Sequence, residues 1–278
     1  MKADEIQNVE DVEIRLLLEG VQRIYGYDFR DYADASIKRR LTQWLSESEF
    51  DTFSHAQSEL LRERSVFESL LRGITVNVTE MFRDPAFFRA VREQVVPFLK
   101  TYPFVKIWHA GCATGEEAYS MAILLNEEGL AGRYRMYATD INEAVLQRAG
   151  DGVMKIADMQ RYTRNYQASG GRGSFADYYT ARYERAILSA SLKKDIVFAP
   201  HNLAVDGEFG EMNMVLCRNV MIYFKPPLKE RCLTLFDSSL LPGGFLCLGL
   251  KESLDKKKIG ANYEEMIRGL RVYRKRYG

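Results

Sequence analysis

A short loop that contains two glycines is the first part of the sequence whose residue types suggest ligand chemistry. Gly111 and Gly115 enclose the loop, which follows an apolar run and precedes a helical pattern. In α/β folds a loop between a strand and a helix often holds a nucleotide-like ligand, because glycine lets the ligand approach the backbone. The loop lacks the full glycine pattern that binds a pyrophosphate, so a purely structural turn is an equal alternative.

Three acidic residues narrow the choice of ligand. Glu116 and Glu117 follow the loop directly, and Asp140 ends the next predicted strand. Acids at this position would repel the pyrophosphate of NAD, whereas S-adenosylmethionine, which carries a sulfonium and an ammonium group, fits better. A carboxylate at Asp140 can accept hydrogen bonds from both hydroxyls of a ribose. The alternative is that Asp140 caps the following helix.

Polar residues also follow two later predicted strands, at the edge where open α/β sheets bind ligands. Asn202 and Leu203 follow one strand, and Arg218 and Asn219 follow the other. An asparagine offers a donor and an acceptor, which suits an adenine edge or an amino-acid group. A role in a turn is at least as good an interpretation for either asparagine.

The elements that must position these residues fall into two parts. Apolar residues at helical spacing predict helices over the first seventy residues or so, the third of them over Phe53–Leu71. From Phe104 onward, strands alternate with helices, which predicts a parallel, doubly wound sheet. The predicted strands are Val105–Trp108, Tyr134–Asp140, Ile196–Ala199, Met212–Cys217, Gly243–Leu250 and Leu270–Arg274. A glycine-rich run, Ser169–Ser174, predicts a mobile surface loop.

Composition excludes several classes of protein. The 278 residues carry a formal net charge of +1, so no global charge favours binding to nucleic acid. No apolar run is long enough to cross a bilayer, and the acidic N-terminus lacks the features of a signal peptide. Four scattered cysteines and three separated histidines predict buried thiols in a reducing compartment and no metal site. We therefore expect a cytoplasmic protein without membrane insertion.

Two further polar segments lie near the predicted domain junction and on the second helix. Asn77–Arg83 places polar groups in an apolar context, where Thr79 as a helix cap and Phe82 as a core residue would be the plain interpretation. Lys38, Arg39 and Arg40 predict a basic helix face. Such a face is usually solvated surface, and docking of an acidic protein partner is the alternative.

Taken in order, these motifs resemble the chemotaxis receptor methyltransferase family, CheR. The matching stretches are Asn77–Arg83, Gly111–Ser120, Ala138–Asn142, Asn202-Leu203 and the eight-residue run Cys217–Phe224. The resemblance implies an α/β, Rossmann-like S-adenosylmethionine-dependent methyltransferase domain preceded by a small all-helical domain. We expect the helical receptor-docking domain at 1–75, a linker with a catalytic motif at 76–103, and the methyltransferase domain at 104–278, with an insertion at about 162–191.

The resemblance also implies the site residues. Arg83 would orient the acceptor carboxylate, and Tyr223 would lie close to the transferred methyl group. Glu117 would face the amino end of the cofactor, and Asp140 its ribose. Together with Gly111 of the glycine loop, the cofactor-binding residues would be Asn77, Thr79, Arg83, Glu117, Asp140, Asn202, Leu203, Arg218 and Asn219.

The implied reaction is methyl transfer from S-adenosylmethionine to glutamate side chains of the cytoplasmic domain of methyl-accepting chemotaxis receptors, by a monomer. The products would be glutamyl methyl esters and S-adenosylhomocysteine. No general base is required, because a glutamate is already ionised at neutral pH. The alternatives are a methyltransferase for a small molecule or RNA, a module that binds S-adenosylmethionine and regulates a partner, and, more distantly, a dehydrogenase.

The sequence departs from the family pattern at three places. Met81 stands where the family often has an aromatic residue, and Gly249–Ser253 replaces a glycine-histidine-serine-glutamate run. The insertion shows no clear counterpart of the glycine-arginine pattern found in members whose insertion grips a receptor peptide. These departures leave the predicted cofactor residues unchanged.

Overall fold

The computed structural model describes residues 3–255 and 259–277, with side chains from residue 9 onward. Contacts between residues divide the chain into two compact units. The helical unit comprises Met1–Val76, Asn202–Asp206 and Tyr223–Cys232. The sheet unit comprises Asn77–His201, Gly207–Ile222 and Leu233–Gly278.

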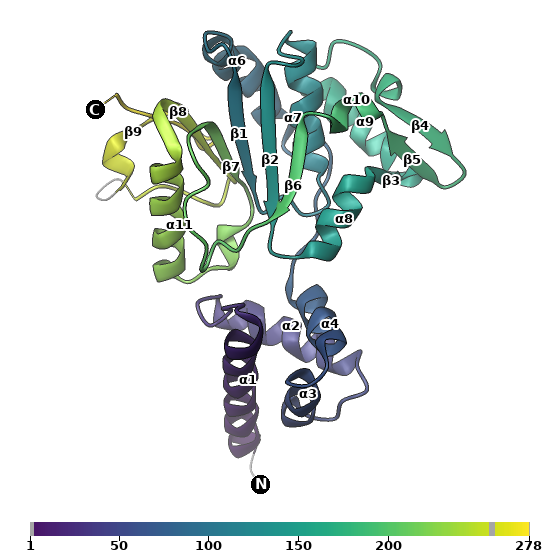
Figure 1. Cartoon of the computed structure of the whole chain (residues 1–278), viewed down its shortest axis with the longest axis vertical. Helices are drawn as coiled ribbons and strands as arrows, with labels where there is room; N and C mark the ends of the chain where they lie inside the picture. Colours follow the sequence, from purple (N-terminus) through teal and green to yellow (C-terminus); the bar gives the residue numbers. More distant parts are fainter. Residues whose placement is uncertain (1–2, 256–258, 278) are drawn as a thin grey trace. The chain divides into compact units, whose positions relative to one another are not determined.

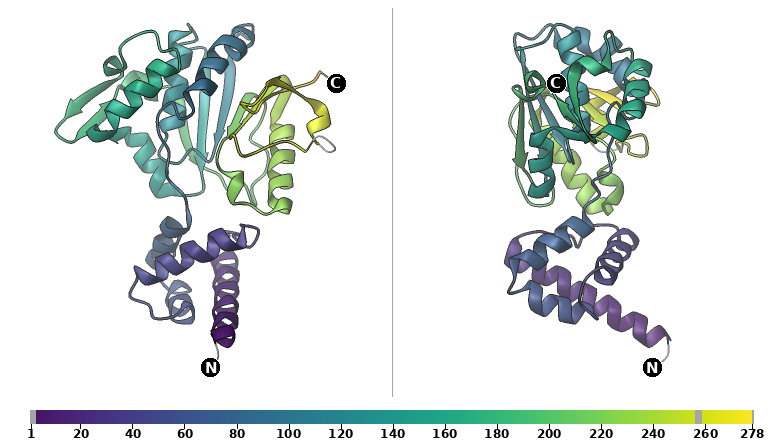
Figure 2. Two further views of the ribbon diagram at one scale, coloured as in Figure 1. Left: turned by 180° about the vertical axis from the view of Figure 1, so that it is seen from behind. Right: turned by 90° about the vertical axis from the view of Figure 1, so that its right-hand side faces the viewer.

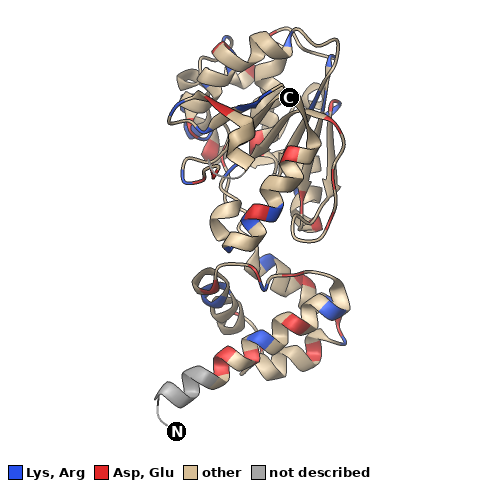
Figure 3. Ribbon diagram, turned by 90° about the vertical axis from the view of Figure 1, so that its left-hand side faces the viewer, with Lys and Arg blue, Asp and Glu red and all other residues tan. Residues whose placement is uncertain are grey.

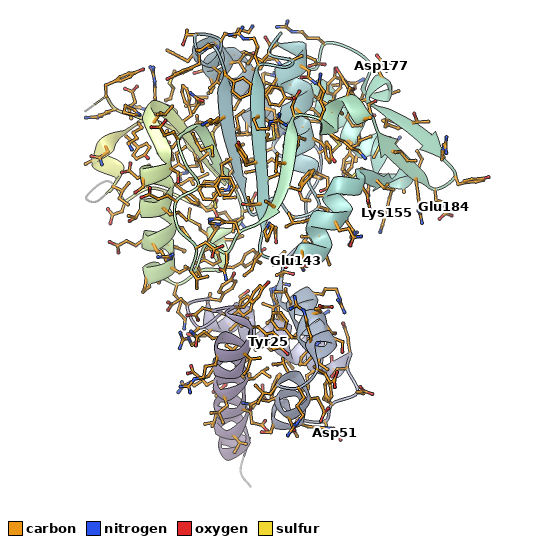
Figure 4. All side chains as sticks on the ribbon, viewed as in Figure 1. Tyr25, Asp51, Glu143, Lys155, Asp177 and Glu184 are labelled. Carbon is orange, nitrogen blue, oxygen red and sulfur yellow. The ribbon has the colours of Figure 1, made fainter. Side chains whose placement is uncertain are left out.

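Four helices form most of the helical unit: α1 (Ala3–Tyr25), α2 (Asp34–Ser46), α3 (Phe53–Leu60) and α4 (Arg64–Ile74). The single helical pattern predicted over Phe53–Leu71 is thus two helices (Figure 1). The side chain of Thr52 caps α3 by accepting a hydrogen bond from the His55 N–H at 3.1 Å. Tyr25, which Figure 4 labels, stacks on Phe67 at 4.0 Å and donates a hydrogen bond to the Leu60 carbonyl.

The sheet unit is built on seven strands in the order β6-β2-β1-β7-β8-β10-β9. Adjacent strands are parallel from β6 to β8, whereas β10 is antiparallel to both of its neighbours. The prediction of a parallel sheet is therefore right for five strands and wrong at one edge, where a short turn joins β9 to β10. The strands are β1 (Val105–Ala110), β2 (Tyr134–Asp140), β6 (Ile196–Pro200), β7 (Met212–Cys217), β8 (Leu240–Leu248), β9 (Tyr263–Ile267) and β10 (Val272–Lys275).

Helices lie against both faces of this sheet, as the turned views of Figure 2 show. The core between the layers includes the wholly buried Trp108, Tyr119 and Phe245. The order of the strands reverses at β1, because the chain moves outward through β2 and β6 and then returns to β7. Ligands of open α/β sheets bind at such a reversal, beyond the carboxyl ends of the strands.

The α- and π-helical segments that follow α4 are α5 (Pro85–Ala90), the π-helical η1 (Val91–Val95), α6 (Val96–Leu99), α7 (Glu116–Glu127), α8 (Glu143–Asp151), α9 (Met159–Ala168), α10 (Ala190–Lys193) and α11 (Pro226–Ser239).

A second, three-stranded antiparallel sheet overlaps the predicted insertion. It consists of β3 (Val153–Lys155), β5 (Arg185–Leu188) and β4 (Tyr179–Arg182), in that order. Figure 4 labels Lys155 on β3 and Glu184 in the turn between β4 and β5.

The glycine-rich run before this sheet is exposed at Arg172, Gly173 and Ser174, and it also has contacts with the rest of the sheet unit. Ser169 is fully buried, and Arg172 pairs with the buried Glu128 at 2.8 Å. The local composition of the run did not reveal this long-range ion pair.

The remaining global predictions concern thiols and membranes. All four cysteines are free and buried, as predicted. No helix in the described part of the chain is long and apolar enough to cross a bilayer.

Candidate active site

The glycine loop between β1 and α7 has the backbone conformation that glycine permits. Gly111 has φ +79° and Gly115 has φ +89°. A Cβ atom at Gly111 would lie 2.5 Å from a methyl carbon of Val220, so a larger residue does not fit without movement. The loop is held to the end of β2, because the N–H groups of Gly111 and Cys112 both donate to the Thr139 carbonyl at 2.8 Å.

Asp140 is oriented by the loop itself. One carboxylate oxygen accepts the Ala113 N–H and the other accepts the Asn142 N–H, each at 3.0 Å. Burial raises the pKa of Asp140 above its ordinary value, while these backbone hydrogen bonds act in the opposite direction. The helix-cap alternative for Asp140 is wrong, since the side chain of Asn142 caps α8 by accepting the Ala144 N–H.

The two acids at the start of α7 differ in their contacts and in the direction of their pKa shifts. Glu116 is buried and accepts a hydrogen bond from the Thr114 hydroxyl at 2.6 Å, and burial raises its pKa. Glu117 lies 3.3 Å from His109 Nδ1 and 2.8 Å from an Nη atom of Arg218. Burial acts to raise the pKa of Glu117, but Arg218 and His109 hold it below its ordinary value. Of the pair, only Glu117 has a lowered pKa and a side chain that is partly exposed, at 18%.

Arg218 joins this carboxylate to a residue that sequence reasoning missed. Its second Nη atom lies 2.7 Å from a carboxylate oxygen of Asp84, and its guanidinium lies 4.0 Å from the centre of the Phe87 ring. The Arg218 side chain is 1% exposed, and its buried Nε has no partner among residues 9–255 and 259–277. Arg218 therefore holds Glu117 and Asp84, rather than presenting both Nη groups to a ligand.

The segment Asn77–Arg83 ends in an uncommon backbone conformation. Phe82, which is fully buried, has φ +53°, and Asp84 has φ +57°. Positive φ at a bulky residue is strained and persists where surrounding contacts enforce it. The Phe82 N–H donates to the Ser120 hydroxyl at 2.8 Å, and Asp84 is held by Arg218. Arg83 lies between these two fixed points.

The side chains of this segment partly match the predictions. Phe82 is a core residue, as predicted, but Thr79 caps no helix, because the next helix, α5, begins at Pro85 after Asp84. Arg83 is partly buried, and no described carboxylate forms an ion pair with it. Asn77 and Thr79 lie in the irregular stretch that leads to this turn.

Asn219 follows Arg218 and is also in the left-handed region, with φ +62°. Its N–H and that of Val220 donate to the two carboxylate oxygens of Glu252, at 3.0 and 3.1 Å. Glu252 also accepts the Gly249 N–H at 2.6 Å, and burial raises its pKa. Glu252 lies in the run where the sequence departs from the family pattern, and it was not predicted as a site residue.

The other predicted site residues belong to the helical unit. Asn202 accepts the Ala204 N–H at 3.0 Å, which is the turn role weighed as its alternative, and Leu203 is buried. The Tyr223 carbonyl accepts the Ala33 N–H at 2.8 Å.

The three basic residues of α2 do not form one face. Lys38 pairs with Asp11 at 2.7 Å and Glu10 at 3.5 Å on α1, and Figure 3 shows residues of both charges on the helices of this unit. The Arg40 guanidinium lies 5.7 Å from the centre of the Tyr223 ring, and burial lowers its pKa. Of the three, only Arg39 is exposed. Successive helical residues point about 100° apart, which explains the separation.

The residues at the strand reversal fit S-adenosylmethionine. Glu117 is an ionised, partly exposed carboxylate that can accept an ammonium group, and Asp140 can accept ribose hydroxyls. The glycines of the loop permit close packing within the protein, because Val220 fills the space beside Gly111 and Ala149 fills the space beside Gly115. The structure therefore brings Gly111, Glu117, Asp140, Arg218 and Asn219 to one edge of the sheet.

Comparisons with known proteins agree with this chemistry. The model of the CheR methyltransferase SAM-binding domain matches residues 77–268, and that of the CheR all-alpha domain matches residues 12–75. The Pseudomonas putida protein named "Putative methyltransferase Cher3" is 49% identical over 95% of this chain and 97% of its own length. "Chemotaxis protein methyltransferase 1" of Vibrio cholerae is 28% identical over 88% and 90%, respectively. The protein is thus an S-adenosylmethionine-dependent methyltransferase that belongs to the CheR family.

Proposed function

We propose that the protein transfers the methyl group of S-adenosylmethionine to glutamate side chains of methyl-accepting chemotaxis receptors. The observation that carries this proposal is Arg83, a half-buried residue whose guanidinium forms no ion pair with any described carboxylate. A guanidinium can bind both oxygens of a carboxylate at once. The strained turn at Phe82 and Asp84 would hold it ready for such an acceptor.

Catalysis in this proposal consists of binding and orientation. S-adenosylmethionine supplies an electrophilic methyl group on its sulfonium. Glu117 would bind the ammonium group of the cofactor, and Asp140 would accept the ribose hydroxyls. Arg83 would align the glutamate oxygen with the methyl group, and Tyr223 would position one of the two by hydrogen bonding. An acceptor that is already ionised needs no proton removal, so proximity and orientation supply the rate enhancement.

The helical unit would dock the receptor. Arg39 is the exposed cation of α2, while Lys38 and Arg40 have contacts within the unit. Asn202 and Leu203 would line the adenine side of the cofactor, with Asn77, Thr79, Arg218 and Asn219 completing the site. We further propose that the enzyme acts as a monomer in the cytoplasm, where the receptor domains that it would methylate are found.

The test is incubation of the protein with tritiated S-adenosylmethionine and a panel of receptor cytoplasmic domains, followed by alkaline treatment. A glutamyl methyl ester releases volatile tritiated methanol, and this is the expected result. Label that resists alkali would indicate another acceptor. Binding of cofactor without transfer to any receptor would favour a regulatory module.

A further inference from the structure

His109 is a buried polar residue in the middle of the sheet, and it was assigned no role from the sequence. It lies on β1, between Ala138 of β2 and Leu216 of β7, and is 1% exposed. Its Nδ1 atom lies 3.3 Å from an oxygen of Glu117. An ionised carboxylate can only accept hydrogen bonds, so Nδ1 carries the hydrogen and donates it.

The Nε2 atom of the ring gives no reason for a histidine at this position. Its Nε2 atom is buried and has no hydrogen-bond partner in the described part of the chain, which is unfavourable for a polar atom. Central strands of parallel sheets are usually apolar along their length, as the neighbouring Ile107, Trp108 and Ala110 are. An apolar side chain would avoid the unpaired nitrogen. The benefit of His109 must therefore lie in what its other nitrogen does.

The contacts of Glu117 show what that benefit is. One carboxylate oxygen faces His109, and the other faces Arg218. Arg218 is also held by Asp84, so it alone would fix only one oxygen of Glu117. The carboxylates of Glu117 and Asp84 and the guanidinium of Arg218 together leave one net negative charge. That charge matches one ammonium group.

We infer that His109 is a positioning residue that holds the Glu117 carboxylate in the orientation that receives the ammonium group of the cofactor. This inference rests on the proposed role of Glu117. It assigns to His109 the recognition of the amino-acid part of the cofactor, through Glu117 and without direct contact. The nucleoside part would be recognised independently of His109.

Two ligands can distinguish recognition of the amino-acid part of the cofactor from recognition of its nucleoside part. S-adenosylhomocysteine contains the amino-acid group, whereas 5′-methylthioadenosine lacks it. Calorimetry without any acceptor should show that His109→Leu binds S-adenosylhomocysteine about tenfold or more weakly, as expected for loss of a hydrogen bond to a charged group. Its affinity for 5′-methylthioadenosine should stay within about twofold of wild type, because no altered contact reaches that ligand.

His109→Asn is the rescue variant, because its side-chain amide can donate from nearly the position of Nδ1. It should recover most of the affinity for S-adenosylhomocysteine. His55→Asn, at an exposed position of α3, is the matched control and should change neither affinity. Thermal melting of each variant shows that it is folded.

Equal loss of both ligands in His109→Leu and His109→Asn would mean general damage to the pocket and would overturn the inference. Unchanged affinity for S-adenosylhomocysteine in His109→Leu would overturn it as well. In either case the proposed methyl transfer would stand, because wild-type binding and receptor methylation are measured separately. A wild-type protein that binds neither ligand would refute the cofactor assignment itself.

Discussion

Replacement of Arg218 by methionine tests the charge cluster of the site most directly. Methionine keeps an unbranched apolar stem but removes the guanidinium that joins Glu117 and Asp84 at 2.8 and 2.7 Å. Removing one partner of a buried ion pair costs about 3–5 kcal/mol, because the remaining charge is buried and uncompensated. Asp84 is 30% exposed and Glu117 is 18% exposed, so we expect the lower end, about 3 kcal/mol.

The loss of folding stability in Arg218→Met should become smaller as the pH falls. Burial acts to raise the pKa of Glu117, but Arg218 and His109 hold it below its ordinary value of 4.5. A carboxyl group whose pKa is lower in the folded state stabilises the fold above its unfolded pKa. That contribution is lost as the pH falls through the folded pKa. The difference between wild type and Arg218→Met should therefore be full at pH 7 and shrink below about pH 4.5.

The assay is urea unfolding of the ligand-free protein at several pH values between 7 and 4. Thermal melting should show a decrease of about 6–12 °C at pH 7, at about 2–4 °C per kcal/mol for a unit of this size. Arg64→Met is the matched control, because Arg64 forms an exposed pair with Glu68 and its loss should cost less than about 0.5 kcal/mol. A loss at pH 7 below about 1 kcal/mol, or a loss that stays constant down to pH 4, would refute the charge argument. The latter result would instead indicate packing of the guanidinium on Phe87.

Three further predictions concern the reaction. Arg83→Ala should lower turnover at saturating cofactor by about 100-fold or more in a radiolabel assay. Arg83→Lys should recover only part of this turnover, because an ammonium cannot bind both carboxylate oxygens. Normal turnover in Arg83→Ala would leave Tyr223 as the candidate for orienting the acceptor. Asp140→Ala should weaken binding of S-adenosylhomocysteine by about 1–3 kcal/mol in calorimetry, and unchanged binding would remove it from the site. Arg39→Glu should slow receptor methylation and reduce its sensitivity to salt, whereas Lys38→Glu should mainly disturb the contact with Asp11. Equal effects of these two reversals on the methylation rate would contradict the division of α2 seen in the structure.

The sequence by itself determined the elements with strong local patterns. The strands Tyr134–Asp140 and Met212–Cys217 have the predicted bounds. The turn at Gly111 was predictable as well, since a positive φ favours glycine. Membership of the CheR family also followed from motifs that are contiguous in the chain. Features of this kind depend on residues that are close together in the sequence, so they can be predicted without the tertiary structure.

The tertiary structure alone decided which charged groups meet. Arg218 lies 134 residues from Asp84 and 101 residues from Glu117, and no local pattern specifies such pairs. The same is true of Glu252, which accepts the N–H groups of Asn219 and Val220, 33 and 32 residues away. The three consecutive basic residues of α2 suggested one basic face, but consecutive residues of a helix point in different directions. Only the folded structure determines what each of them contacts. The positions of charged residues can be read from the sequence, but their ion-pair partners depend on how the strands are ordered in the sheet.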